Sequence, residues 1–213
     1  MKLLSINVVE PKTVVDHGRQ VETGIFKKPV SGPVKVRFLN LEGDRQADLR
    51  VHGGPNKAVY VYTRENIDYW RECLGRSDLV PGTFGENLTV EELPETLVSI
   101  GDEFEIGTAR FQVSQPRLPC FKLGIVMGDQ RFVKTFQKSG RTGFYVRVLR
   151  EGTIEAGDEI LRIPTADTEP VTVAEMVRII TARKPKPDDA RRALKLGALS
   201  DGWKRQIEEK LAR

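Results

Sequence analysis

The sequence predicts a mainly β fold for residues 1–164 and a small three-helix domain for residues 165–213. Short segments rich in β-branched and aromatic residues recur through the first part, with Gly, Pro and Asp between them, as is typical of strands and turns. After Pro164, apolar residues three and four positions apart replace that pattern and indicate helices. The length of 213 residues also exceeds the usual size of one domain. These observations together favour a large β domain followed by a small helical one.

The predicted strands mix alternating and continuous apolar runs, which favours a closed or strongly curved sheet such as a β-barrel. The chain begins with one such strand within residues 1–10. Two Gly-Asp turns, at residues 101–102 and 157–158, lead into strands of the same sheet. The other strand-like segments are residues 34–38, 58–62, 104–106, 110–114 and 144–149.

A few short helices are predicted to interrupt this sheet. One begins after Thr63 as its N-cap and ends at Gly75, and another begins after Asp129 and ends at Gly140. Each carries apolar residues on one helical face. The residues expected to point inward are Ile67, Trp70 and Leu74 in the first helix and Phe132, Val133 and Phe136 in the second.

Three further helices are predicted after an Ala-Asp-Thr-Glu-Pro linker. Thr172 and Glu175 have the spacing of a capping box at the start of the first. A Lys-Pro-Lys-Pro segment ends that helix, and the second then runs to Leu196, before a glycine. Ser200 is expected to be the N-cap of the third.

The composition indicates a globular chain without a membrane-spanning segment. Hydrophobic residues make up 39% and charged residues 30%, and no apolar run is long enough to cross a bilayer. The apolar stretch at the start is too short for a signal peptide, so a cytoplasmic location is expected. The net charge is +4, and basic residues outnumber acidic ones after residue 164. Such a tail could bind nucleic acid, but the interleaved acidic residues favour a solvated helical surface.

Cys120 has the surroundings of a reactive cysteine. It follows two prolines at the end of a strand, and Arg117 and Lys122 lie on either side of it. Proline rigidity holds the backbone in place and neighbouring cations favour the thiolate, which is both a nucleophile and a soft metal ligand. One thiolate is too few for a zinc site, so a metal here would need ligands from a cofactor. The alternative is a buried structural cysteine, which is the interpretation for Cys73.

A Gly-Gly turn at Gly53 and Gly54 could lie against an anion, because glycine lets backbone amides approach a ligand closely. Lys57 would add a positive charge, and His52 lies next to the turn. The alternatives are a tight turn between two strands and a histidine with a structural hydrogen bond.

A second glycine-containing loop spans residues 81–89 and leads into a strand. Glu86 and Asn87 stand at the start of that strand, where they could place a carboxyl group and an amide on a pocket wall. A plain turn explains the same residues equally well.

Together, these segments resemble the MOSC domain, the family named for the C-terminal domain of molybdenum cofactor sulfurases. The resemblance is closest to the stand-alone bacterial YiiM type, whose appended domain the three-helix tail also resembles. The match runs over residues 1–164. The residues that carry it are 43–48, 52–54 with 57–60, 85–88, 115–120 with Lys122, and 143–148 with 157–158.

The resemblance implies a MOSC β-barrel with molybdenum cofactor (molybdopterin) in a pocket at one end. It implies that Cys120 is the catalytic residue and the molybdenum ligand. Basic and polar residues of the other motifs are then expected to bind the pterin phosphate or line the pocket. These expected cofactor-binding residues are Arg45, His52, Gly53, Gly54, Lys57, Glu86, Asn87, Gln115, Arg117 and Lys122.

By the same resemblance, the expected activity is the reduction of N-hydroxylated compounds such as hydroxylaminopurines and amidoximes. An external flavin or iron–sulfur reductase is the expected electron donor, because the sequence has no flavin or iron–sulfur motif. A non-catalytic module that carries molybdenum cofactor or sulfur is the alternative, and nucleic-acid binding by the tail is a third, less favoured interpretation. The sequence leaves open whether the chain forms a homodimer.

Overall fold

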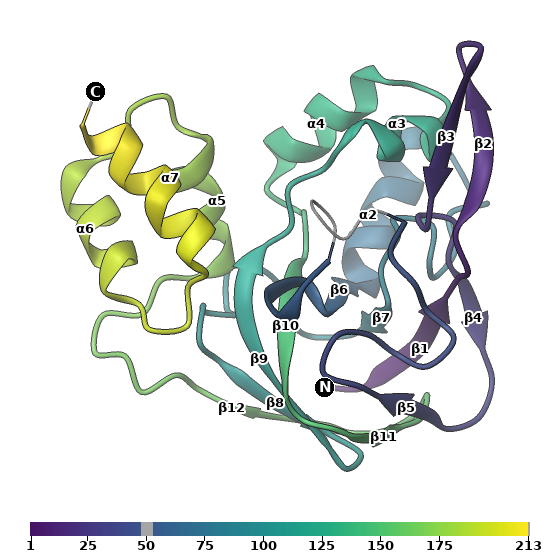
Figure 1. Cartoon of the computed structure of the whole chain (residues 1–213), viewed down its shortest axis with the longest axis horizontal. Helices are drawn as coiled ribbons and strands as arrows, with labels where there is room; N and C mark the ends of the chain where they lie inside the picture. The colour runs from purple at the N-terminus through teal and green to yellow at the C-terminus, as the bar shows by residue number, and fades with distance from the viewer. Residues whose placement is uncertain (48–52, 213) are drawn as a thin grey trace.

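The computed structural model describes residues 1–47 and 53–212 and has a sheet-rich mixed fold with a group of helices at its C-terminal end (Figure 1). The main sheet has eight strands in the order β12-β8-β9-β10-β6-β7-β1-β4. In chain order they are β1 (Leu3–Val8), β4 (Lys28–Val30), β6 (Val59–Thr63), β7 (Leu88–Val90), β8 (Glu103–Ile106), β9 (Ala109–Pro116), β10 (Phe144–Arg150) and β12 (Ile160–Ile163). Two small sheets pair β2 (Lys12–Asp16) with β3 (Arg19–Thr23) and β5 (Val34–Val36) with β11 (Gly152–Ile154).

The main sheet is antiparallel except between β6 and β7, which pair in parallel. Its outer strands in the ladder are β12 and β4. An isolated bridge between Lys2 and Glu159 brings the start of the chain against the start of β12. No ladder between strands of the described residues closes the sheet, so barrel closure stays a prediction.

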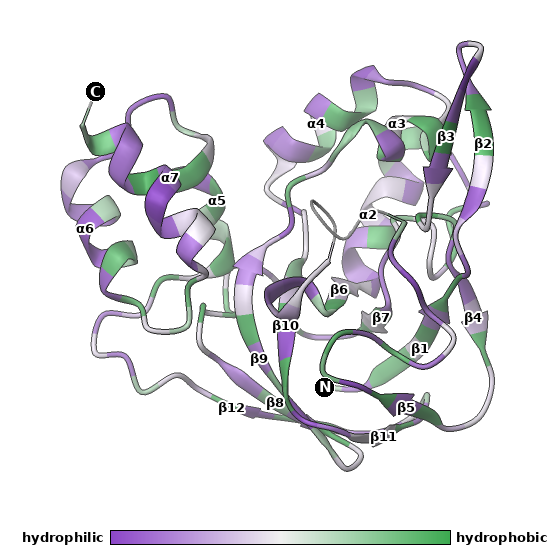
Figure 2. Cartoon of the chain, in the orientation of Figure 1, coloured by the Kyte–Doolittle hydropathy of each residue, from purple (hydrophilic) through white to green (hydrophobic). Residues whose placement is uncertain are grey.

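The apolar core runs from the sheet into the C-terminal helices without a break. Phe111 of β9 and Phe144 of β10 belong to the same buried cluster as Met176, Trp203 and Ile207 of the helical segment. Figure 2 colours much of α5 (Val173–Thr181) as hydrophobic, and this helix packs on β9. The helical segment is therefore held to the sheet by apolar burial, and the division at residues 164 and 165 stays a proposal about domains.

The helices of the first part largely follow the sequence prediction. In α2 (Arg64–Leu74), the hydroxyl of Thr63 accepts from the backbone N–H of Asn66, and Gly75 ends the helix with φ 61°. Leu74 was expected to point inward, but it is exposed because it lies in the last turn. The other predicted helix is α4 (Arg131–Ser139), where Phe132 and Phe136 are buried as expected.

The helix α3 (Phe121–Met127) follows Cys120 directly and was not predicted. Its sequence contains Gly124 and two β-branched residues, which disfavour helix by propensity alone. Tertiary packing overrides that preference, since a Cβ atom at Gly124 would lie 2.9 Å from the Cα atom of Gln130. Only glycine therefore lets α3 pack this closely against the segment that leads into α4.

The three C-terminal helices are α5, α6 (Pro187–Lys195) and α7 (Asp201–Leu211). The capping box of Thr172 and Glu175 at the start of α5 is confirmed. Ser200 stands at the N-cap position of α7, but the cap expected from its side chain is wrong. Its hydroxyl instead donates to the side-chain carbonyl of Gln115 on β9, 3.0 Å away. No helix in the described part of the chain is long and apolar enough to cross a membrane.

Candidate functional site

A pocket opens where β6, β9 and β10 meet the segments that follow β3 and precede β7. It encloses about 670 Å³ free of protein atoms, its open mouth included. Its lining residues are Thr23, Gly24, Ile25, Lys27, Asp44, Arg45, Gln46, Ala47, Lys57, Tyr60, Phe84, Gly85, Asn87, Arg117, Leu118, Cys120, Lys122 and Tyr145.

Cys120 lies in this lining, partly buried, between the end of β9 and the start of α3. Several other residues predicted from the sequence line the same pocket: Arg45, Lys57, Asn87, Arg117 and Lys122. The second cysteine, Cys73, is exposed on α2, so its interpretation as a packed structural residue is wrong. Residues far apart in the sequence are thus brought together around one of the two thiols.

Arg117 is a buried cation of the pocket, with a residue exposure of 5%. Its guanidinium lies 5.2 Å from the ring centre of Tyr60 and 5.1 Å from that of Phe136. One terminal nitrogen, Nη2, is 3.4 Å from the carbonyl oxygen of Phe84, whereas Nη1 has no hydrogen-bond partner among the described residues. A buried guanidinium with an unpaired nitrogen is costly, and an anion in the pocket would offset that cost.

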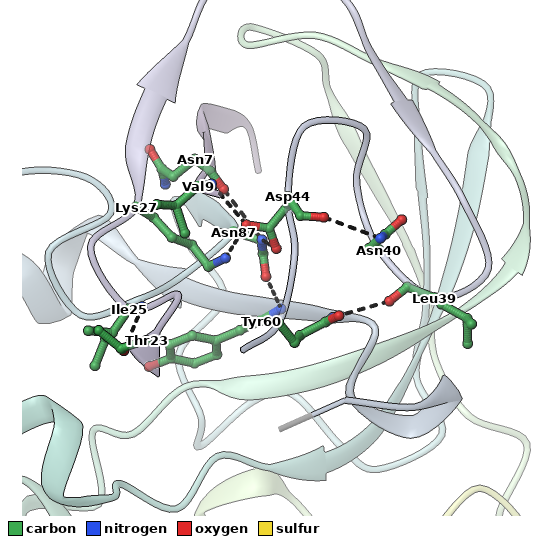
Figure 3. Close-up of polar contacts among 11 residues, drawn as sticks. Asn7, Val9, Thr23, Ile25, Lys27, Leu39, Asn40, Asp44, Tyr60 and Asn87 are labelled. Atoms are coloured by element: carbon green, nitrogen blue, oxygen red, sulfur yellow. Dashed lines mark hydrogen bonds and ion pairs between the residues drawn. The ribbon is translucent and has the colours of Figure 1, made fainter. Parts of the chain in front are cut away.

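Lys27 and Asp44 form a buried ion pair in the pocket wall (Figure 3). Asp44 also accepts the backbone N–H of Val9 at 3.0 Å and the side-chain N–H of Asn87 at 2.8 Å. Burial lowers the pKa of Lys27, and the Asp44 carboxylate opposes that shift. Neither residue was among the predicted site residues. Asp44 lies within the 43–48 motif that the resemblance used, but no pattern in the sequence marked Lys27.

Asn87 joins this wall to the sheet. Its side-chain oxygen accepts the backbone N–H of Tyr60 at 3.1 Å, while its side-chain nitrogen donates to Asp44 (Figure 3). Both ends of the amide are therefore engaged within the protein. Asn87 lines the pocket, but its hydrogen bonds hold the wall in shape.

Glu86 lies behind the wall and is not among the residues that line the pocket. Its carboxylate accepts the backbone N–H groups of Gly82 at 2.6 Å and Phe84 at 3.1 Å and the hydroxyl of Thr89 at 3.0 Å. Burial raises the pKa of Glu86 to about 7, although these hydrogen bonds act in the opposite direction. Glu86 thus shapes the loop that presents Phe84 to the pocket.

Among the described residues, Gln115, Gly53 and Gly54 are predicted site residues that lie outside the lining. Gln115 is buried on β9 and contacts Ser200 of the helical segment. Gly53 and Gly54 do not line the pocket, but Gly54, with φ 89°, leads into the short 3-10 helix η1 (Pro55–Lys57) that carries Lys57. His52 lies outside the described residues. The motif around the Gly-Gly turn therefore predicted Lys57 correctly as a pocket residue, whereas its two glycines do not line the pocket.

The pocket has a strong excess of positive charge. Asp44 is the one carboxylate among the described lining residues, and it is paired with Lys27. The cations are Lys27, Arg45, Lys57, Arg117 and Lys122. Burial lowers the pKa of Lys57, and it raises the pKa of Tyr145, whose phenol therefore stays protonated at neutral pH. No group of three or more His, Cys, Asp and Glu side chains in the described ranges could hold a metal ion by itself. The arrangement can bind an anionic ligand beside a thiol.

Two family models match the chain. The one described as "MOSC domain" matches residues 48–161, and the one described as "YiiM-like, 3-alpha helix domain" matches residues 171–213. The protein YflK of Bacillus subtilis (strain 168) is 41% identical over 211 residues, which cover 99% of this chain and 95% of that protein.

A solved structure and a third protein extend these similarities. The crystal structure of YiiM from Geobacillus stearothermophilus is similar with a TM-score of 0.82 and 33% identity, covering 99% of this chain and 98% of that one. A protein named "Reductase" from Gibberella moniliformis (strain M3125 / FGSC 7600) is 36% identical over 146 residues. That match covers 67% of this chain but 26% of the fungal protein.

Proposed function

The chain belongs to the MOSC family, and from this premise we propose that it binds molybdenum cofactor and reduces N-hydroxylated compounds such as hydroxylaminopurines and amidoximes. The single observation that carries the proposal is that Cys120 and the buried, incompletely paired Arg117 line one pocket. A thiolate is a soft metal ligand, and a buried guanidinium recognises phosphate. The pocket thus offers both kinds of group that a phosphate-bearing pterin with a bound metal requires.

The proposed roles follow from position and charge. Cys120 would ligate molybdenum, and Arg117 would bind the phosphate or the anionic edge of the pterin through its unpaired Nη1. Arg45, Lys57 and Lys122 would add positive charge around the same ligand. When bound, the cofactor would supply two-electron redox chemistry at the metal.

Reduction of an N–OH group to N–H releases water and consumes two electrons and two protons. The electrons would come from an external flavin or iron–sulfur reductase. Tyr145 lines the pocket with a phenol whose pKa burial raises, so its O–H can donate a hydrogen bond to the substrate oxygen. The aromatic rings of Tyr60 and Phe84 exclude water from the same wall, which strengthens the charge interactions inside. The similarity to a protein named "Reductase" supports this type of reaction, although it spans a minor part of that protein.

The test is molybdenum and pterin analysis of the protein from a host that makes the cofactor, together with reduction of a hydroxylaminopurine by a supplied reductase. Cys120→Ala should lose both the metal and the activity. Cys73→Ala is the matched control, because Cys73 is exposed on α2 and lies outside the pocket, and it should keep both. Unchanged turnover in Cys120→Ala would sink the mechanism. Molybdenum or a persulfide at Cys120 without turnover would favour the alternative of a carrier module.

A further inference from the structure

The helical segment contains a second hollow, between the end of α5 and the start of α6. It encloses about 620 Å³ free of protein atoms, its open mouth included, which is similar to the 670 Å³ of the pocket around Cys120. Four cations line it, Arg178, Lys184, Lys186 and Arg192, together with the carboxylates of Glu175 and Asp189. The hollow shares no lining residue with the pocket around Cys120.

The two carboxylates of this hollow are already engaged by one cation. Arg192 donates to Glu175 at 2.9 Å and lies 3.8 Å from Asp189. Glu175 also accepts the backbone N–H of Thr172 in the capping box. Arg178, Lys184 and Lys186 have no ion pair or side-chain hydrogen bond within the part of the chain that the structure describes. Three positive charges therefore remain around the hollow without an anion.

The walls of the hollow are held in place by local structure. Lys184 and Lys186 alternate with Pro185 and Pro187, and proline restricts φ and removes backbone donors. Pro185 is buried, which anchors the segment between its two lysines. From α7, the ammonium of Lys210 donates to the backbone carbonyls of residues 180 and 182 at the end of α5. The backbone that carries Lys184 and Lys186 therefore has little conformational freedom, which lowers the entropic cost of binding a ligand.

We propose that this hollow is a binding site for a small phosphate-bearing compound, separate from the pocket around Cys120. Phosphate oxygens would contact Arg178, Lys184 and Lys186, and the remaining volume would accept a small substituent on the phosphate. Concentration of the cations in one hollow favours a small molecule over a nucleic acid, which would call for a basic stripe along the surface. On α7 the acidic residues Glu208 and Glu209 lie beside Lys210 in the sequence, so the charge of that helix is mixed.

The experiment is an ¹⁵N-labelled NMR titration of the full chain at low ionic strength with inorganic phosphate, then with adenosine monophosphate. Saturable shifts are expected at the backbone amides of the non-proline residues between 178 and 192. They should persist in Cys120→Ala, because the site is independent of the proposed cofactor pocket. The double variant Lys184→Gln/Lys186→Gln should weaken binding about tenfold, as expected for the loss of two exposed charge contacts.

Arg183→Gln is the matched control, because Arg183 is an exposed cation in the same segment but does not line the hollow. It should bind phosphate within about twofold of the parent chain. Absence of saturable shifts in residues 178–192, or equal weakening by Arg183→Gln and the double variant, would overturn the proposal. Tighter binding of a single-stranded RNA, with shifts spread along α6 and α7, would also overturn it and would indicate a nucleic-acid surface.

Discussion

The two basic hollows of this protein hold their charge in opposite ways. Around Cys120 the cations Lys27 and Arg117 are buried. Lys27 forms an ion pair with the carboxylate of Asp44, and the guanidinium of Arg117 lies over the rings of Tyr60 and Phe136. In the helical segment, Lys184 and Lys186 stand exposed at the rim. Charge interactions are several times stronger in a buried environment than in water, but burial of each ion costs free energy of folding.

This difference separates a site suited to chemistry from a site suited to reversible binding. Buried charges are held in one geometry and act strongly on a ligand, as a redox centre requires. Exposed charges add modest affinity that salt can screen, which suits a ligand that exchanges with solution. The comparison therefore predicts that changes to the buried charges Lys27, Asp44 and Arg117 destabilise the fold strongly, and that changes to the exposed lysines of the helical hollow do so weakly.

The sharpest test of this contrast is Asp44→Ala. The substitution leaves Lys27 buried without its counterion and removes the acceptor of Asn87 and of the Val9 backbone. We expect a loss of about 3–5 kcal/mol in the free energy of unfolding, as for other buried ion pairs that lose one partner. Urea denaturation at neutral pH measures it.

The control for Asp44→Ala removes both charges at once. Lys27→Met combined with Asp44→Asn keeps the approximate volume of both side chains and leaves no unpaired ion. It should recover part of the loss, because the desolvation cost disappears together with the ion pair. A loss below about 1 kcal/mol in Asp44→Ala would show that water reaches Lys27, and the contrast between the two hollows would fail.

The next test uses the buried carboxyl group of Glu86. Burial raises its pKa from 4.5 to about 7, so between these pH values the folded chain keeps a proton that the unfolded chain releases. The contribution of Glu86 to the free energy of unfolding should therefore fall as the pH rises from 4.5 to 7 and should level off above 7. The contribution of this one group over the window is roughly 3 kcal/mol.

Glu86→Gln removes this titration and should make the decline between pH 5 and pH 8 shallower, while Glu95, whose pKa burial also raises, keeps its own contribution. Glu92→Gln, at an exposed position, is the control and should follow the parent chain. If the parent and Glu86→Gln gave parallel curves across that range, the carboxyl of Glu86 would already be ionised at low pH. The wall behind Phe84 would then be held by a carboxylate throughout this pH range.

Much of the fold was predictable because local signals and tertiary packing agree. The Thr63 cap, the capping box of Thr172 and Glu175, and the glycine ends at Gly75 and Gly140 all act through backbone groups of neighbouring residues. Such signals can be recognised within a few residues. The exception is α3, whose helical structure depends on close packing at Gly124 and is not indicated by the helix propensities of its residues.

The site was predicted in part, and the reason lies in how its residues meet. Cys120, Arg117 and Lys122 share one short segment, so proximity in the sequence revealed them. Lys27 lies in a segment with no motif of its own and reaches the pocket only through long-range packing on Asp44. Glu86 and Gln115 belong to motif segments, but their side chains are engaged outside the lining. Glu86 accepts backbone N–H groups of its own loop, and Gln115 accepts the hydroxyl of Ser200.

The smallest expected effect concerns the joint between the two regions, where Ser200 donates to Gln115. Both residues are buried, so Ser200→Ala leaves the Gln115 oxygen without this donor and should lower the free energy of unfolding by about 1 kcal/mol.

Loss of a helix cap at Ser200 would lower the free energy of unfolding by a similar amount, so the single variant cannot separate the two roles. A double-mutant cycle with Gln115→Ala does separate them, because the energy of a helix cap arises within α7 and does not depend on the residue at position 115 of β9. A coupling energy of about 1 kcal/mol between the two substitutions would show that the hydrogen bond from Ser200 to Gln115 stabilises the packing of the helices on β9, the strand that leads to Cys120. Additive losses would return Ser200 to the capping role that its position in the sequence predicts.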